Sequence, residues 1–416
     1  MHILFFSHYF PPEGNAPASR TYENCKRWIR LGHRVTVITC APNVPDGKVY
    51  EGYKNRLYKK ENIDGIDVIR VWTYISANKG TLRRIINYIS YMFSSIFFSI
   101  FIKKPDVIIA TSPQFFCGWA GVISSRIRRR PFILEIRDIW PESIKVVGAM
   151  QNEKILRVLE WLELKMYAAA QHIVTVGDGY KYKLVEKGIN PDVISVITNG
   201  FDSEIFYPRD TDEIFSKTYK PNHEFICSYV GTIGMACGLD VVLRAAKLLK
   251  DRQRHNIKFL LVGSGAFKQQ LQKQALEEKL DNVVFVERQN KQLIPDFLSI
   301  TDVCLVHLKK AELFKTVLPS KMFEAAAMSL PIILGVQGYA AQFLKKANAG
   351  ICIEPDNEKE LADAVIKMAD NPQLCKSFGK SGFEYVTKHY NRNQLADEYL
   401  DTITHFGLQE KQTVTV

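Results

Sequence analysis

The stretch FKTVLPSKMFEAAAMSLPIILG, residues 314–335, decides the fold that we predict for this chain. Pro319 and Ser320 precede a run of helix-forming residues, and the apolar residues 332–334 follow after a second proline. Proline and serine are typical of the first positions of a helix, and a short apolar run is typical of a buried strand. A strand that follows a short helix so closely indicates the alternating elements of a parallel α/β sheet. The stretch therefore predicts a helix over 320–329 in an α/β domain.

The start of this helix also carries the residue types that bind a nucleoside diphosphate. Unpaired backbone N–H groups and the positive end of the helix dipole favour an anion there, and Lys321 adds a full charge. The carboxylate of Glu324 can accept hydrogen bonds from two ribose hydroxyls. The alternative is a capped helix whose early glutamate only complements the dipole. A capping box places Glu three residues after Ser320, whereas Glu324 comes four after it, so the pattern favours a ligand site.

Two glycine loops follow predicted strands of the same half. Gly231, Thr232 and Gly234 come after strand 226–230, and Gly263 and Gly265 come after strand 258–262. Glycines in such loops let backbone N–H groups point at phosphate oxygens. A tight turn between strand and helix needs the same glycines, so both interpretations stay open. The second loop lacks the last glycine of G-x-G-x-x-G and has Lys268 in its place, which makes it a weak motif.

Strands and helices alternate in two series along the chain. The first series has predicted strands 3–7, 35–39, 68–72, 107–110, 132–136 and 172–176 and helices 18–31, 114–128 and 153–170. The second has strands 226–230, 258–262, 283–285, 303–306 and 332–334 and helices 239–250, 266–279 and 320–329. Each series predicts one doubly wound parallel sheet, and the charged, proline-containing stretch 199–222 links them. Ligands bind at the carboxyl ends of such strands, and all the motifs lie there, so two facing sheets would form a cleft.

Four stretches together resemble one family. They are P-S-K-x-x-E at 319–324, VITNGFD at 196–202, YVGTIG at 229–234 and LEIRDIWPES at 134–143. The set resembles the retaining nucleotide-sugar glycosyltransferases of family 4, which have the GT-B fold. The last stretch is similar to the WbuB-type subgroup, associated with bacterial O-antigen and exopolysaccharide assembly. The resemblance covers residues 1 to about 405.

The resemblance implies two Rossmann-like domains and an activity. Residues 1–200 would bind the acceptor, 201–385 would bind the nucleotide sugar, a closing helix 386–406 would return to the first domain, and 407–416 would be a flexible tail. The enzyme would move a sugar, an N-acetylated aminosugar, from a UDP-sugar to a polyprenyl-diphosphate-linked saccharide with retention of configuration. We expect no cofactor and no metal. The D-x-D at Asp210 and Asp212 lies in the charged linker without a flanking strand, where a solvated turn is expected.

The resemblance also implies roles for single residues. Lys321 and Glu324 would hold the donor, Gly14 would close over its phosphates, and Arg288 would lie along the base. Asp138 would bind sugar hydroxyls beside the indole of Trp140, and its alternative role is to cap the turn at Pro141. His8, in the loop of Gly14, is either a base or a loop histidine.

The chain departs from the family pattern at three positions. The arginine and lysine that clamp the diphosphate are replaced by Thr232 and Cys237. The first glutamate of the pair spaced eight apart is Thr316, with Glu312 close to it in sequence. These departures place more of the charge on Lys321. They also keep two rivals open, a sugar-nucleotide 2-epimerase of the same fold and a non-catalytic nucleotide-sugar-binding subunit.

Composition and net charge limit the classes of partner that we expect for this chain. The chain has 416 residues, 46% of them hydrophobic, which is enough for two cores, and a net charge of +11. That charge suits a polyanionic neighbour, but no nucleic-acid-binding motif accompanies it, so we expect no nucleic acid. The eight cysteines form no C-x-x-C pair, which fits a reducing cytoplasm. The amino terminus is predicted to be a first strand rather than a signal peptide.

One apolar segment raises the question of a membrane. Residues 85–102 are uncharged and lie between Arg83-Arg84 and Lys103-Lys104. A spanning helix would separate strands 68–72 and 107–110 on opposite sides of the bilayer, so we expect a helix of the first domain with one apolar face. Together with the basic run 126–130, it predicts a protein that lies peripherally on the anionic cytoplasmic face of the inner membrane.

Overall fold

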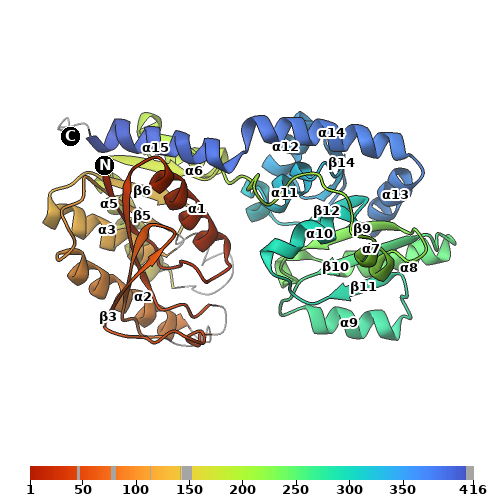
Figure 1. The fold of residues 1–416 in the computed structure, drawn as a ribbon, viewed down its shortest axis with the longest axis horizontal. Coiled ribbons are helices and arrows are strands. Elements are labelled where there is room, and N and C mark those ends of the chain that lie inside the picture. Colours follow the sequence, from red (N-terminus) through yellow and green to blue (C-terminus); the bar gives the residue numbers. More distant parts are fainter. Residues whose placement is uncertain (45–46, 76–80, 113, 141, 143–151, 409–416) are drawn as a thin grey trace. The chain divides into compact units, whose positions relative to one another are not determined.

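Two sheets organise the chain, each in its own unit (Figure 1). This computed structural model describes residues 1–44, 47–75, 81–112, 114–140, 142 and 152–408. Unit 1 comprises Met1–Asn199 and Asn393–Val416, and unit 2 comprises Gly200–Arg392. The predicted α/β class, with one parallel-sheet domain in each half, is confirmed.

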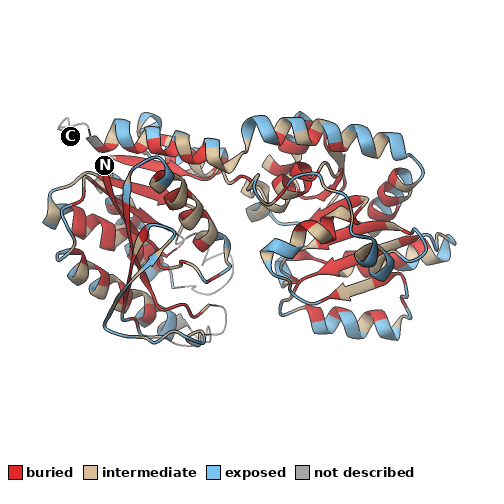
Figure 2. Cartoon of the chain, in the orientation of Figure 1, coloured by how far each residue is buried: buried red, intermediate tan, exposed pale blue. Residues whose placement is uncertain are grey.

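The first sheet has the strand order β3-β4-β2-β1-β5-β6-β7-β8. Its strands are β1 (His2–Phe6), β2 (Arg34–Cys40), β3 (Tyr58–Ile63), β4 (Ile66–Val71), β5 (Val107–Thr111), β6 (Phe132–Ile136), β7 (His172–Thr175) and β8 (Ile194–Val196). All neighbours pair in parallel except β3, which is antiparallel to β4. The inner strands are buried throughout (Figure 2), because helices cover both faces of a parallel sheet.

Two helical layers cover this sheet. One face packs against α1 (Ala16–Arg30) and α15 (Arg392–Leu408), which bury Trp28 and Tyr399. The other packs against α2 (Thr81–Ser99), α3 (Phe115–Arg128) and α5 (Glu153–Ala169). The short helix α6 (Asp178–Glu186) lies between β7 and β8 in the chain.

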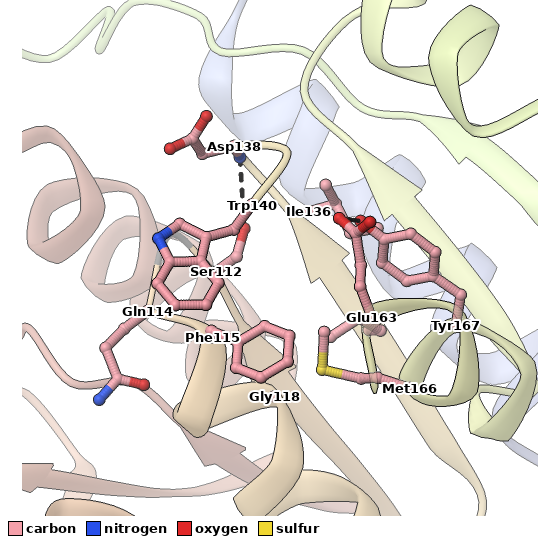
Figure 3. A pocket seen from close by; sticks show the side chains of 11 residues that line it. Ser112, Gln114, Phe115, Gly118, Ile136, Asp138, Trp140, Glu163, Met166 and Tyr167 are labelled. Carbon is pink, nitrogen blue, oxygen red and sulfur yellow. Dashed lines mark hydrogen bonds between the residues drawn. The ribbon is translucent and has the colours of Figure 1, made fainter. Parts of the chain in front are cut away.

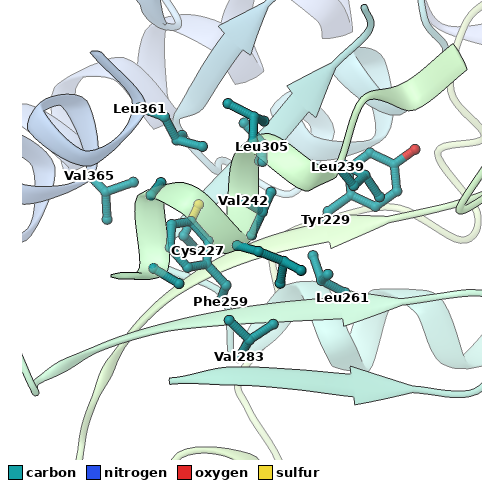
Figure 4. Packing of buried hydrophobic residues seen from close by; sticks show 14 of the residues in the cluster. Cys227, Tyr229, Leu239, Val242, Phe259, Leu261, Val283, Leu305, Leu361 and Val365 are labelled. Atoms are coloured by element: carbon teal, nitrogen blue, oxygen red, sulfur yellow. The ribbon is translucent and has the colours of Figure 1, made fainter. Parts of the chain in front are cut away.

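The second sheet has the order β11-β10-β9-β12-β13-β14 and is parallel throughout. Its strands are β9 (Phe225–Val230), β10 (Ile257–Val262), β11 (Val283–Val286), β12 (Val303–His307), β13 (Ile332–Gly335) and β14 (Gly350–Cys352). Its helices are α7 (Glu213–Tyr219), α8 (Asp240–Asp251), α9 (Lys268–Glu277), α10 (Ile294–Ser299), α11 (Lys321–Ala327), α12 (Tyr339–Ala347), α13 (Glu358–Ala369) and α14 (Pro372–His389). Figure 4 shows part of the core, in which Phe259 and Leu305 pack with Val242 of α8 and Leu361 and Val365 of α13.

The helix predicted over 320–329 is shorter in the structure. It ends at Ala327, because Ser329 adopts a left-handed φ of 56° and turns the chain. The N–H of Leu330 then bonds to the carbonyl of Ala325, and the N–H of Ser329 to that of Ala326. This is the Schellman pattern that satisfies the last carbonyls of a helix.

The end of the chain differs from the prediction in two respects. Residues 386–389 belong to α14 in unit 2, and the helix that returns to unit 1 is α15, which begins at Arg392. The predicted tail starts too early, since Gly407 still lies in α15, close to Val107. Residues 409–416 of the predicted tail lie outside the described residues.

The apolar segment 85–102 forms most of α2, as predicted for a helix of the first domain. The Tyr91 hydroxyl donates to the carbonyl of Ile38 at 2.8 Å, and the hydroxyls of Ser99 and Ser124 lie 3.1 Å apart. Among the residues that the structure describes, no helix is long and apolar enough to cross a bilayer. One residue of the basic run has a local role, because Arg128 donates to the carbonyls of Ile100 and Ile102, each at 2.6 Å.

A buried arginine joins three parts of the first domain. Arg20 on α1 donates to Glu135 of β6 at 3.0 Å. It also donates to the carbonyls of Ile197 at 2.7 Å and Thr198 at 2.6 Å, and to the side chain of Asn199 at 3.2 Å. Both charged side chains are buried, so each compensates the desolvation of the other.

We expect Arg20→Met to destabilise the first domain by about 3–5 kcal/mol, because the substitution removes the hydrogen-bonded cation of the buried Glu135 carboxylate and leaves only Arg137, at 3.8 Å. The measurement is the free energy of unfolding from urea titration, with the exposed Arg56→Met as the matched control, expected within about 0.5 kcal/mol of the wild type. A loss below about 1 kcal/mol for Arg20→Met would show that the ion pair adds nothing beyond an ordinary hydrogen bond.

Candidate functional site

The glycine loops after β9 and β10 lie directly against each other. The Gly231 N–H bonds to the Val262 carbonyl, and the Ile233 N–H to the Ser264 carbonyl, both at 2.9 Å. A Cβ on Gly263, whose φ is 151°, would lie 1.9 Å from the Gly231 oxygen, and one on Gly265 would lie 2.3 Å from the Ile233 oxygen. Gly263 and Gly265 are therefore required by backbone packing, which favours the structural interpretation of the second loop.

Lys321, at the first turn of α11, reaches the first of these loops. Its Nζ lies 3.7 Å from the centroid of the Tyr229 ring, a cation–π contact. A Cβ on Gly231 would lie only 3.0 Å from the same ammonium. The structure thus brings together Gly231 and Lys321, which lie ninety residues apart in sequence, at the carboxyl end of β9.

The ammonium of Lys321 lies in a low-dielectric environment. Burial lowers its pKa to about 8, although the nearby Cys237, Glu324 and Cys304 act in the opposite direction. Glu324 follows on the same helix one turn later and is half-buried. A cation whose charge is poorly compensated gains from an anionic ligand, because the ligand replaces the lost hydration.

Hydrogen bonds to the Thr232 carbonyl stabilise the loop after β9. The Tyr229 hydroxyl donates to the Thr232 carbonyl at 2.8 Å, and the Cys237 thiol donates to the same oxygen at 3.1 Å. His307 extends the network, with Nδ1 2.7 Å from the Cys237 carbonyl and Nε2 accepting from the Asp356 N–H at 3.0 Å. Burial lowers the pKa of His307, so the neutral ring donates through Nδ1 and accepts through Nε2.

His307 is not among the residues predicted from the sequence, where its only local signal is a histidine at the end of a buried strand. Lys268, which stands in the place of the last glycine of G-x-G-x-x-G, is buried and has a structural role. Its Nζ donates to the carbonyls of Gly263 at 3.0 Å and Val286 at 2.9 Å. It therefore joins the ends of β10 and β11.

Ser320, Gly234 and Arg288 are the other residues predicted to bind the nucleotide sugar. The Ser320 hydroxyl makes no capping bond to α11, and its carbonyl accepts from the N–H groups of Phe323 and Glu324 at 3.0 and 3.3 Å. Gly234 precedes the short turn Met235–Cys237, and Arg288 lies exposed in the loop after β11. These residues stay candidates by position alone.

The loop near Thr316 is paired locally. Glu312 is exposed, and its carboxylate lies 2.6 Å from the Lys315 ammonium within the turn Glu312–Thr316. Gly338, with φ of 72°, packs on this turn, because a Cβ there would lie 2.0 Å from the Lys315 carbonyl oxygen. Glu312, whose carboxylate could substitute for the glutamate missing at Thr316, is therefore paired with Lys315.

In the first domain, Gly14 lies exposed between two anchored residues. Glu13 is buried and accepts from the N–H groups of Asn43 at 2.8 Å and Val44 at 3.0 Å. Asn15 accepts from the Ala18 N–H at 2.9 Å and caps α1. The loop is thus fixed on both sides of the glycine.

His8 is buried in the same loop. Its ring meets the rings of Tyr9, Tyr88 and Tyr91 edge-on, at 4.9, 5.4 and 4.8 Å. Burial lowers its pKa to about 3, so the ring is neutral and packed among aromatic groups. This environment favours the loop-histidine alternative over a catalytic base.

Asp138 lies at the rim of a small pocket between α3 and α5 (Figure 3). Its N–H donates to the Ser112 hydroxyl at 3.3 Å. The Trp140 ring stacks on Phe115, with centroids 4.8 Å apart, so one face of the indole is covered. The pocket volume of about 10 Å³ admits a water molecule but no sugar ring. The capping alternative at Pro141 and the neighbouring Ser143 lie outside the described residues.

Glu163, which is not among the residues predicted from the sequence, lines this pocket. The carboxylate accepts from the Tyr167 hydroxyl at 2.5 Å and from the Lys187 ammonium at 2.7 Å. Burial raises its pKa despite both partners. No sequence signal separates this glutamate from others on an amphipathic helix.

No cluster of three or more His, Cys, Asp or Glu side chains suited to a metal occurs among the residues that the structure describes. In the D-x-D stretch, the Asp212 side chain accepts from the Phe215 N–H at 2.8 Å and caps α7. Asp212 therefore begins a helix, at a place where the sequence predicts a solvated turn.

Comparison with known proteins identifies both halves. The family described as glycosyl transferase 4-like domain matches residues 15–200, and glycosyl transferases group 1 matches residues 210–385. The chain is 26% identical to the putative colanic acid biosynthesis glycosyl transferase WcaI of Escherichia coli, over 97% of this chain and 100% of the relative. It is 22% identical to the capsular polysaccharide biosynthesis glycosyltransferase CapM of Staphylococcus aureus, over 74% and 79% of the two chains.

Solved structures share the fold at low sequence identity. Sucrose-phosphate synthase from Thermosynechococcus elongatus superposes with a TM-score of 0.73 at 16% identity, over 97% of this chain and 98% of the other. Anabaena HepE in complex with UDP-glucose gives 0.71 at 16% identity, over 97% and 100%. The predicted GT-B fold is confirmed.

We expect the affinity for a nucleoside diphosphate such as UDP to fall by about tenfold between pH 7 and pH 9, because Lys321 with a pKa of about 8 loses its proton there. The affinity is full well below pH 8, where the ammonium is charged, and is lost as the pH rises through about 8. Isothermal calorimetry measures this profile. Lys321→Gln should bind weakly with a flat profile, and Cys237→Ser, which keeps a donor to Thr232, should retain the wild-type slope. A slope that survives Lys321→Gln would assign the titration to another group.

Proposed function

Because this chain belongs to the glycosyltransferases, with a 4-like domain followed by a group 1 domain, we propose that it transfers a sugar from a UDP-linked donor with retention of configuration. The observation that carries the proposal is the Lys321 ammonium, held over Tyr229 beside Gly231 at the carboxyl end of β9. HepE, whose fold is the same, has been solved with UDP and with UDP-glucose.

The proposed role of Lys321 is to stabilise the departing diphosphate. Negative charge grows on the leaving group as the glycosidic bond breaks, and a preorganised cation in a low-dielectric site lowers the barrier most at that stage. Glu324 binds the ribose hydroxyls from the same helix. The amides of Thr232 and Gly234 face the phosphates, since those of Gly231 and Ile233 bond to the carbonyls of Val262 and Ser264. The diphosphate then takes the proton of the attacking acceptor hydroxyl.

The proposed acceptor is a polyprenyl-diphosphate-linked saccharide in O-antigen or exopolysaccharide assembly of the WbuB type. Support comes from the names of the relatives, which include colanic acid, capsule and O-antigen chain glycosyltransferases. The first domain would hold this acceptor near Gly14 and Asp138, and an N-acetylated aminosugar is the proposed donor sugar. A lipid-linked acceptor lies at the membrane surface, so the protein would lie peripherally on the cytoplasmic face of the inner membrane.

The replaced residues Thr232, Cys237 and Thr316 favour one further candidate, a subunit that binds nucleotide sugars without turnover. Incubation of the purified protein with labelled UDP-sugars and bacterial lipid extract separates the candidates. Label in the lipid fraction is the expected result. Binding without turnover would indicate the subunit, and a 2-epimerised nucleotide sugar would indicate an epimerase.

We expect Glu324→Gln to weaken UDP binding by about 1.5–3 kcal/mol, because an amide cannot accept both ribose hydroxyls as a carboxylate does. Calorimetric titration measures the effect. Glu312→Gln is the matched control, since Glu312 is exposed and paired with Lys315, and its affinity should stay at the wild-type value. Equal affinities for all three proteins would remove Glu324 from the donor site.

We expect transfer to continue in excess EDTA, because Lys321 and the loop amides supply the charge stabilisation that a metal would otherwise provide. The measurement is the initial rate with and without EDTA. A complete loss that magnesium or manganese restores would contradict the expectation. The variant Asp210→Asn would then test the D-x-D stretch.

A further inference from the structure

Helix α2 carries a row of exposed aromatic side chains. Phe93, Phe97 and Phe101 are 64%, 55% and 71% exposed and recur every fourth residue, so they share one side of the helix and the turn after it. The rings of Phe97 and Phe101 lie 5.2 Å apart. No charged residue occurs from residue 85 to 102. We call these three residues the phenylalanine ridge. Exposed apolar rows of this kind mark contact with a partner or a membrane.

A pocket of about 140 Å³ opens at the end of the ridge. Phe101 belongs to both, and Phe98 and Tyr58 form the apolar wall of the pocket with ring centroids 5.2 Å apart. Arg34, Lys60, Asp67 and Lys103 supply its charged groups. The lining residues come from β2, β3, β4, the end of α2 and the turn after it, so tertiary packing builds the pocket.

The charges of the pocket leave an excess of cations. Asp67 accepts from Arg34 at 3.0 Å and lies 3.1 Å from the Lys60 ammonium, so one carboxylate serves two cations. Lys103 is exposed at the rim and adds a third cation. Three cations against one carboxylate leave a net charge of about +2 beside apolar walls, which suits an anion that carries an apolar tail.

The pocket is distinct from the candidate acceptor site. Arg34 and Asp67 lie at the amino-terminal ends of β2 and β4, whereas Gly14 and Asp138 follow the carboxyl ends of β1 and β6. The length of a five- to seven-residue strand, about 20 Å, separates these two edges of one sheet. A change in the pocket can therefore alter membrane binding without altering the reacting groups.

We propose that this pocket binds the phosphodiester headgroup of an anionic phospholipid while the phenylalanine ridge enters the acyl region. Arg34, Lys60 and Lys103 surround the phosphate, and Phe98 and Phe101 contact the glycerol and the first methylenes. The ridge lies beside the pocket, as a lipid with its headgroup there requires. The inference rests on the proposed function only in that a lipid-linked acceptor requires the domain to reach a membrane.

The test is co-sedimentation of the full chain with phosphatidylcholine vesicles that do or do not contain phosphatidylglycerol. Lys103→Glu should lower the partition coefficient about five- to twentyfold, and Phe101→Ser should lower it about tenfold. The matched controls in the second domain are Lys247→Glu, at an exposed lysine, and Leu276→Ser, at a leucine that is 80% exposed. Both controls should stay within about twofold of the wild type. Variants that match their controls would overturn the proposal.

A second arm separates a headgroup site from diffuse attraction. Vesicles whose equal negative surface charge comes from a fatty acid should bind several-fold more weakly than phosphatidylglycerol vesicles, and equal binding would overturn the pocket. Short-chain phosphatidylglycerol should compete, whereas inorganic phosphate at the same concentration should not. Equal competition would mean a site for free phosphate rather than a lipid. UDP affinity of each variant confirms folding, and transfer to a detergent-dispersed acceptor tests the proposed function separately.

Discussion

The geometry of the first domain depends on the buried ion pair and hydrogen bonds of Arg20. A buried guanidinium needs partners for its donors, and here they are the Glu135 carboxylate and the last carbonyls before the chain leaves the domain at Asn199. Glu135 is the residue before the last of β6, and Arg137 approaches the same carboxylate at 3.8 Å. The ion pair therefore fixes helix α1, the strand end that presents Asp138, and the start of the linker in one arrangement.

In the second domain, the loops after β9 and β10 are held together by direct backbone contact rather than by a buried ion pair. Gly263 and Gly265 allow two loops to touch. Thr232 and Cys237, at the positions where the family pattern leads us to expect cations, are joined by a hydrogen bond from the Cys237 thiol to the Thr232 carbonyl. The positive group that the structure places beside Gly231 is then the ammonium of Lys321. Its pKa is depressed because desolvation outweighs the opposite effect of the nearby Cys237, Glu324 and Cys304.

Helix α2 shows how one apolar sequence divides between two environments. Tyr91, Met92, Ile96 and Phe98 pack with the core of the first domain, whereas the phenylalanine ridge stays outside it. A hydropathy profile cannot distinguish these faces, because both are apolar. The same helix thus supplies part of the core and a surface whose composition suits a lipid phase.

The sequence by itself determined the class of the fold and the position of most candidate residues along it. Buried strands of a parallel sheet are short continuous apolar runs, and the motifs lie next to their carboxyl ends, so local patterns suffice. Only the tertiary structure decided which side chains meet. Lys187, which pairs with Glu163, and the partners of His307 and Asp67 lie on other elements, and Ser320 lacks the capping bond that its sequence context suggests. Such pairings depend on how strands and helices pack in three dimensions, and the order of residues along one element carries no record of the neighbours that packing brings to it.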